Sequence, residues 1–183
     1  MHYYGAKELA SSFHTVRKNT IQTAEDIPEE HYGFALAEGT KTIAQTLVHI
    51  ALSPRLQLTI HGNERRLSFE GFDFPAFMKQ LAGEESKDRT KAQILDLLRN
   101  DGDRFTGFLD GVTEEFLAEP FAMPAGATPA SKSRFEMLLS VKEHEMHHRG
   151  QLAVAQRLLG IVPHLTRARQ AHATQATTSA SKS

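Results

Sequence analysis

The chain has 183 residues, enough for one domain with a substantial core, and its 21 Lys and Arg nearly balance 22 Asp and Glu, giving a formal net charge of −1. This balance offers no basic field for phosphates, so we expect no nucleic-acid partner. Cysteine is absent, which excludes disulfides, thiolate metal sites and cysteine nucleophiles and leaves His and carboxylate as ligands for a tight transition-metal site.

The N-terminal third of the chain predicts two helices. Apolar residues at spacings of three and four indicate a first helix over about 6–25. A second helix begins with Thr40 or Thr42 as its N-cap and continues to about residue 60. Pro54 falls inside this second pattern and lacks a backbone N–H, so we expect the helix to kink or break there.

Two further helices follow a long connection. The connection, over about 62–87, carries four phenylalanines, so we expect it to lie along the bundle, with a short helix near 77–81. A capping box at Thr90 begins the third helix, and a second capping box at Ser133 begins the fourth. Gly160 is a natural C-terminal cap for the fourth helix.

These elements define the expected fold class and domain organisation. Four helices without strand alternation indicate an all-α four-helix bundle, and the long connection between helices 2 and 3 favours a crossover topology. We expect one domain over 1–167 and a disordered tail over 168–183, because the tail has no large apolar residue to bury. No stretch approaches the roughly 20 apolar residues of a membrane span, and no signal-peptide pattern is present. A cytoplasmic protein without a membrane partner is therefore expected.

A histidine pair on the fourth helix carries the main chemical signal. His144 and His148 lie four residues apart, about 40° around the helix axis, so both imidazoles can reach one ion. They share a face with apolar residues of the same helix, where an imidazole requires a hydrogen bond or a metal. The alternative is a pair of core histidines satisfied by hydrogen bonds. His49 in the second helix is a third candidate, although it flanks the apolar stripe there.

Polar neighbours of the pair are candidates for a supporting shell. Metal-bound histidines usually donate their second N–H to an acceptor, which makes Gln151, Glu145 and Glu143 candidates. Gln151 lies near the face of the pair and could line a pocket. Glu145 points about 100° away from His144, and we expect it to be a surface or interface charge.

Three other polar residues are expected to lie outside the ligand set. His147 projects about 100° from His148 and is not counted as a ligand. Arg149 could orient an anionic substrate, but a salt bridge is the favoured interpretation. His61, beside Gly62 near the end of the second helix, is expected to face solvent.

Two motifs resemble the DinB family, a bundle superfamily that includes YfiT-like proteins. One is the second-helix segment 42–50, Thr-Ile-Ala-Gln-Thr-Leu-Val-His-Ile, and the more specific one is 144–152, His-Glu-Met-His-His-Arg-Gly-Gln-Leu. The ending Leu-Gly-Ile-Val-Pro over 159–163 is also similar to the family. The resemblance covers about residues 5–167.

The resemblance implies a four-helix bundle with a three-histidine metal site, whose matching positions are His49, His144 and His148. The metal in the family is usually discussed as nickel or zinc, and homodimers are common. Some relatives transfer low-molecular-weight thiols. This sequence lacks a Trp near the second-helix His and carries Pro54 there, so no substrate is carried over from the family.

Three neutral imidazoles leave at least one coordination position open for water or a thiolate. We therefore expect a metal-dependent enzyme acting on a small molecule, with thiol S-transfer slightly ahead of hydrolysis. The alternative is a non-catalytic stress-response or binding module whose metal site is structural or vestigial.

Overall fold

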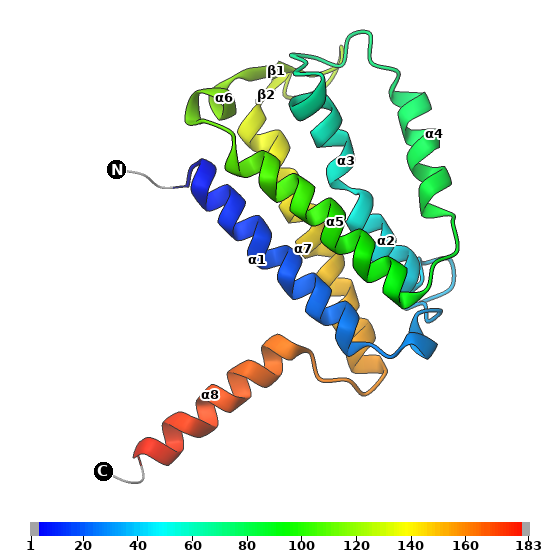
Figure 1. Ribbon diagram of the computed structural model, residues 1–183, viewed down its shortest axis with the longest axis vertical. Coiled ribbons are helices and arrows are strands. Elements are labelled where there is room, and N and C mark those ends of the chain that lie inside the picture. Colours follow the sequence, from blue (N-terminus) through cyan, green and yellow to red (C-terminus); the bar gives the residue numbers. More distant parts are fainter. Residues whose placement is uncertain (1–3, 181–183) are drawn as a thin grey trace.

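The computed structural model describes residues 4–180, with side chains described through Gln175, and four long helices form its body (Figure 1). They are α1 (Ala6–Asp26), α2 (Ile43–Leu52), α5 (Lys91–Asp110) and α7 (Arg134–Leu158). The predicted all-α four-helix bundle is confirmed. Among residues 4–180, no helix is long and apolar enough to cross a membrane.

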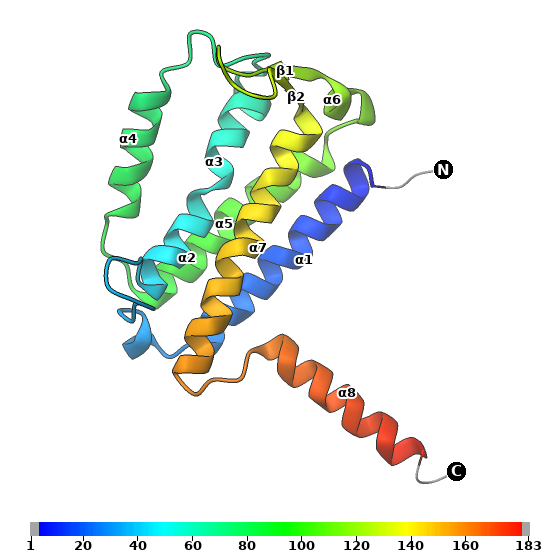
Figure 2. The same ribbon diagram turned by 180° about the vertical axis from the view of Figure 1, so that it is seen from behind.

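The order of the helices around the bundle explains the long connection. α5 packs against both α1 and α2, and α7 packs against the same two helices, so α1 and α2 lie diagonally. The colour gradient in Figures 1 and 2 shows that α2 and α5 run in the same direction, opposite to α1 and α7. Because α2 and α5 are parallel neighbours, the chain must return along the whole bundle between them. α4 (Phe74–Glu85) makes most of this return, which confirms the predicted crossover.

The second helix breaks at the predicted place. α2 ends at Leu52, and a new turn, α3 (Pro54–Gln57), begins with the proline at its first position. The first residues of a helix have no intrahelical partner for their N–H, so proline is tolerated there. Inside a helix, the missing N–H of Pro54 would leave one backbone carbonyl without its hydrogen bond. A π-helical segment, η2 (Leu58–Asn63), follows directly.

Capping boxes begin three of the four bundle helices. The Thr90 and Ser133 boxes predicted from sequence are both formed. Of the two possible caps for the second helix, Thr42 is the one used, and its hydroxyl accepts from the Gln45 N–H. Gly160 follows α7 with a φ of 76°, the left-handed conformation that favours glycine at this position.

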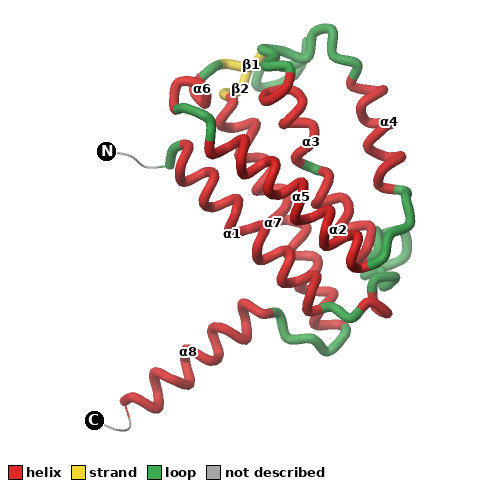
Figure 3. The backbone as a smooth tube through the Cα atoms, in the orientation of Figure 1, coloured by secondary structure: helices red, strands yellow, loops and turns green. Residues whose placement is uncertain are grey.

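Several short elements at the ends of the bundle were not predicted. They are η1 (Glu29–His31), α6 (Glu114–Ala118), β1 (Pro120–Ala122) and β2 (Ser131–Ser133). The two strands pair antiparallel, with Phe121 opposite Lys132, and form the small hairpin drawn in yellow in Figure 3. Three-residue strands are too short for an alternating pattern to be visible in the sequence.

The predicted exposure of His61 is wrong. Its side chain is fully buried, packs edge-on against Phe121 of the hairpin, and its Nδ1 lies 2.8 Å from Nη1 of Arg134. The hairpin, which the sequence pattern did not reveal, covers this end of the bundle and buries the imidazole. Burial, followed by the charge of Arg134, lowers the pKa of His61 to about 4.

The C-terminal segment also differs from its prediction. Residues expected to form a disordered tail are helical through Ala180, as part of α8 (His164–Ala180), and this helix projects away from the bundle (Figures 1 and 2). Its described side chains from Arg167 to Gln175 are exposed. The composition correctly indicated a lack of burial, but alanine-rich sequence also has a high helix propensity. Residues 181–183 lie outside the described residues.

Candidate metal centre

Helices α2 and α7 bring three imidazoles together. The Nε2 atom of His144 lies 3.0 Å from Nε2 of His49 and 3.1 Å from Nε2 of His148. One nitrogen from each ring lies within 4.8 Å of the others, and all three residues are half-buried. The structure therefore places the three sequence-predicted ligands in one cluster, which we call the histidine cluster.

Two of the three rings have an acceptor for their second nitrogen. Nδ1 of His49 lies 2.6 Å from Oε1 of Glu85, and Nδ1 of His148 lies 2.8 Å from Oε1 of Gln151. Because a carboxylate or amide oxygen only accepts, the neutral form of each ring carries its proton on Nδ1 and presents a bare Nε2 lone pair. This is the tautomer that metal-bound histidines adopt when an outer acceptor orients them.

Burial also favours the neutral form of two cluster histidines, His144 and His148. Burial, followed by the neighbouring His148 and His49, lowers the pKa of His144 to about 4. Burial likewise lowers the pKa of His148, against an opposing effect of its hydrogen bond with Gln151. His144 and His148 are therefore uncharged near pH 7, the state in which imidazole binds metals.

The contacts among the three Nε2 atoms fit a cation better than a hydrogen-bond network. His144 sits between two bare lone pairs, and a proton on its Nε2 could satisfy only one of them well. Two nitrogens bound at a right angle about 2.1 Å from one ion would lie roughly 3.0 Å apart. The two separations from Nε2 of His144 match that value. The ligand atoms of all three rings lie within 4.8 Å of one another, so the cluster is a candidate site for one divalent transition-metal ion.

Glu85 is the site residue that the sequence analysis missed. It comes from the C-terminal end of α4, and its Oε2 also pairs with Lys41 Nζ at 3.1 Å. Burial raises the pKa of Glu85, but hydrogen bonds from His49 and Lys41 lower it by more, so the carboxylate stays charged. A need for a carboxylate partner was foreseeable, but choosing Glu85 required the path of α4.

The expected position of Glu145 is wrong. Its side chain is fully buried and accepts hydrogen bonds from Arg17, from Nε at 3.0 Å and from Nη2 at 2.9 Å. Arg17 also donates to the carbonyls of Leu98 at 2.7 Å and Ile50 at 3.3 Å. One guanidinium from α1 thus contacts α2, α5 and α7. A buried carboxylate needs such a partner, and Arg17 is 128 residues away in sequence.

The remaining candidates have simpler positions. Gln151 contacts His148, as described above, and its Nε2 lies 3.3 Å from Nε2 of the exposed His147. Arg149 donates to the carbonyl of Val16 at 3.4 Å instead of forming the expected salt bridge. Glu143 is exposed. Among Gln151, Arg149 and Glu143, Gln151 is the one that hydrogen-bonds to a cluster histidine.

A crossover four-helix bundle with converging histidines on α2 and α7 is the arrangement that the sequence resemblance implies. The chain belongs to the DinB family, whose sequence pattern matches residues 2–179. A comparison with curated proteins finds no match.

Solved structures support the same fold. YjoA, a DinB-like protein of Bacillus subtilis, is 23% identical over 84% of this chain and 92% of its own, with a TM-score of 0.61. YfiT of Bacillus subtilis is 18% identical over 85% and 88%, with a TM-score of 0.61, and is described as a probable metal-dependent hydrolase with an unusual four-helix bundle topology. ClbS, a colibactin self-resistance protein solved with double-stranded DNA, is 15% identical over 86% and 98%, with a TM-score of 0.64. At these identities the likeness shows the fold alone.

Proposed function

We propose that this protein binds one divalent transition-metal ion, nickel or zinc, through Nε2 of His49, His144 and His148 and catalyses a metal-dependent reaction on a small molecule. The observation that carries the proposal is the convergence of three imidazoles, two of them oriented by outer acceptors. Such an arrangement has no structural need in a core that apolar residues could fill, whereas it is what a metal site requires.

The residues around the cluster have distinct roles in this proposal. Glu85 holds the His49 ring in its metal-binding tautomer and adds a negative charge behind it, while Lys41 keeps that carboxylate in place. Gln151 does the same for His148 without adding charge. An ion held by three neutral imidazoles would activate a water or a thiol in its open position near neutral pH.

Hydrolysis is the reaction that we place first. YfiT, which shares the fold, is described as a probable metal-dependent hydrolase, and three neutral ligands preserve the ion's charge for lowering the pKa of a water. Thiol S-transfer, favoured by the sequence analysis, would use the same open position. The two reactions are distinguished by their products.

The experiment is elemental analysis of the purified protein combined with activity assays. We expect about one equivalent of nickel or zinc in wild type and much less in His144→Ala, with wild-type content in His14→Ala, which removes an exposed histidine of α1. Metal-dependent turnover of nitrophenyl esters supports hydrolysis. Turnover only of a low-molecular-weight thiol with an electrophile supports S-transfer instead.

Equal metal content in wild type and His144→Ala would contradict the three-histidine site. Metal that raises the melting temperature without any turnover would favour the non-catalytic binding or stress-response module. A homodimer and a cytoplasmic location stay predictions. So does the lack of a nucleic-acid partner, which rests on the charge balance, although ClbS was solved with DNA.

A further inference from the structure

A small cavity adjoins the histidine cluster between α7 and the loop that precedes α2. Its volume is about 230 Å³, and two of its lining residues, His148 and Gln151, belong to the candidate metal centre. The other lining residues are Phe34, Leu36, Thr40, Lys41, Ile43, Thr46, Leu152 and Ala155. The cavity and the cluster therefore share one wall.

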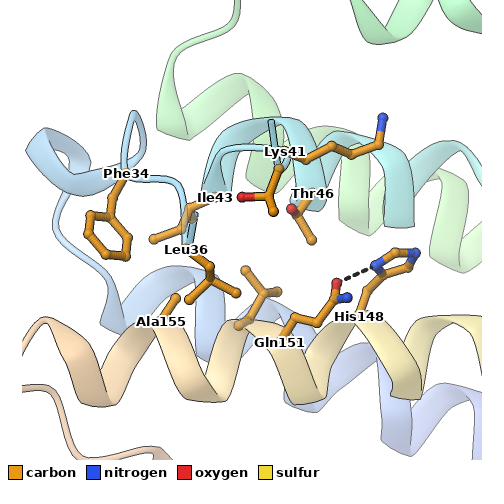
Figure 4. Close-up of a pocket in the computed structure, with 10 residues that line it drawn as sticks. Phe34, Leu36, Lys41, Ile43, Thr46, His148, Gln151 and Ala155 are labelled. Atoms are coloured by element: carbon orange, nitrogen blue, oxygen red, sulfur yellow. Dashed lines mark hydrogen bonds between the residues drawn. The ribbon is translucent and has the colours of Figure 1, made fainter. Parts of the chain in front are cut away.

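The two ends of this cavity differ in polarity (Figure 4). His148, Gln151 and Thr46 lie at one end, with Lys41 beside them, whereas Phe34 and Ala155 lie at the other. Apolar side chains therefore surround the part of the cavity that is farther from the histidines. An apolar cavity of this kind favours apolar groups over water, which finds no hydrogen-bond partners there.

The loop wall of the cavity is held in place by backbone hydrogen bonds. The N–H of Ile43 donates to the carbonyl of Phe34 at 2.9 Å, and the N–H of Ala44 donates to the carbonyl of Tyr32 at 2.9 Å. Phe34 and Leu36 pack against the apolar core around α2. The cavity is thus formed before a ligand arrives, which reduces the entropy cost of binding.

We propose that this cavity binds the apolar end of the substrate and so makes the site selective for amphipathic small molecules. The inference rests on the proposed metal function, because the polar head of such a molecule would lie at the His148 end. A cavity of about 150 Å³ holds benzene, so this cavity suits an apolar group of about six to nine carbons. The head is neutral or carries one negative charge, because Lys41 alone is charged among the described side chains that line the cavity, and it is already paired with Glu85.

The test uses straight-chain hydroxamic acids, which are uncharged in solution near pH 7 and bind metals as the deprotonated hydroxamate, on the full chain loaded with Zn²⁺. Isothermal titration should show the affinity rising about fourfold for each added methylene, from acetohydroxamate to a chain of about seven to ten carbons, and then no further. Leu36→Trp fills the apolar end, so its total gain with chain length should fall below about threefold while acetohydroxamate still binds with wild-type affinity. Leu67→Trp, at a highly exposed position outside the cavity, is the matched control and should behave like wild type.

Two results would overturn the proposal: a wild-type affinity that does not depend on chain length, or a full chain-length gain in Leu36→Trp. If Leu36→Trp does not fold, Leu36→Ala replaces it, and its smaller apolar wall should reduce the gain per methylene.

A metal-free experiment separates this proposal from the proposed function. With metal-free protein, 1-hexanol but not methanol should shift the methyl NMR signals of Leu36, Ile43 and Leu152. If hexanol shifts these signals but added Zn²⁺ does not bind to the protein, the apolar cavity is supported and the metal site is contradicted. A lack of hexanol shifts would contradict the cavity as an apolar subsite, even where a hydroxamate binds through the metal.

Discussion

His144 and Glu145 are adjacent in sequence but belong to two opposite kinds of buried polar cluster. Glu145 and Arg17 form a closed pair, in which the carboxylate is fully buried and Arg17 also donates to two backbone carbonyls. His144 is half-buried, its Nε2 meets two other nitrogens, and its Nδ1 has no partner among the described residues.

The difference indicates which cluster is structural and which is functional. A buried ion pair with satisfied hydrogen bonds fixes the alignment of the helices that supply it. Lone pairs that converge without enough protons to satisfy them are unfavourable unless a ligand is bound. We therefore infer that the Arg17 pair holds the bundle together, and we propose that the histidine cluster binds a metal ion.

The largest expected effect comes from breaking the closed pair. Glu145→Leu leaves the Arg17 charge buried without an opposite charge, which should cost about 3–5 kcal/mol of unfolding free energy. Urea titration measures this loss, and Glu143→Leu, at an exposed position of the same helix, should change stability by less than about 1 kcal/mol. The double variant Arg17→Met/Glu145→Leu should regain most of the loss. A loss below about 1 kcal/mol in Glu145→Leu would contradict the structural role.

His61 sharpens the comparison, because it is buried, has one satisfied nitrogen and lies away from the histidine cluster. Its folded pKa of about 4 is below the unfolded value near 6.5. As the pH falls, the unfolded chain therefore binds a proton at this imidazole before the folded chain does. The free energy of unfolding should decrease by up to about 3 kcal/mol between about pH 6.5 and pH 4 for this reason. Urea titrations at pH 7.5 and 4.5 should show a smaller difference for His61→Gln than for wild type. An equal difference in both would contradict the lowered pKa.

Two glycines of α5 test how tightly Arg17 is packed. A Cβ on Gly102 would lie 2.8 Å from Cγ of Arg17, whereas a Cβ on Gly107 would meet nothing within 4 Å. Gly102→Ala should therefore destabilise the protein by about 1–3 kcal/mol. Gly107→Ala should stabilise it by up to about 1 kcal/mol, because alanine is the better helix former. Thermal unfolding of the two variants tests this, and a shift in the same direction for both would contradict tight packing around Arg17.

The smallest effect on stability, but a clear one on binding, is expected at Glu85. Glu85→Gln removes the carboxylate that orients His49, so metal affinity should fall about tenfold to a hundredfold. Glu84→Gln is the matched control, because the carboxylate of Glu84 lies next to Glu85 in sequence but pairs with Lys87 and Arg89. Competition with a chromophoric chelator measures both affinities. Equal affinities in the two variants would mean that Glu85 does not support the site.

The bundle was predictable because its signals are local. Apolar spacing, the capping boxes at Thr90 and Ser133 and the break at Pro54 each depend on residues within a few positions of one another. The pairing of His144 with His148 was visible for the same reason, since both lie on one helix.

The parts that could not be predicted depend on contacts between distant segments. Glu85 reaches His49 because α4 returns along the bundle, and no local pattern fixes that path. Arg17 reads as an ordinary helix charge until α7 supplies its partner. Gly102 reads as a weakness in its helix, although it makes room for the Arg17 side chain.

The most direct test of the metal site is anomalous diffraction from crystals of the full chain grown with nickel or zinc. The account predicts a single strong peak at the histidine cluster, about 2.1 Å from Nε2 of His49, His144 and His148. A peak elsewhere on the molecule, or no peak at the three converging histidines, would contradict it.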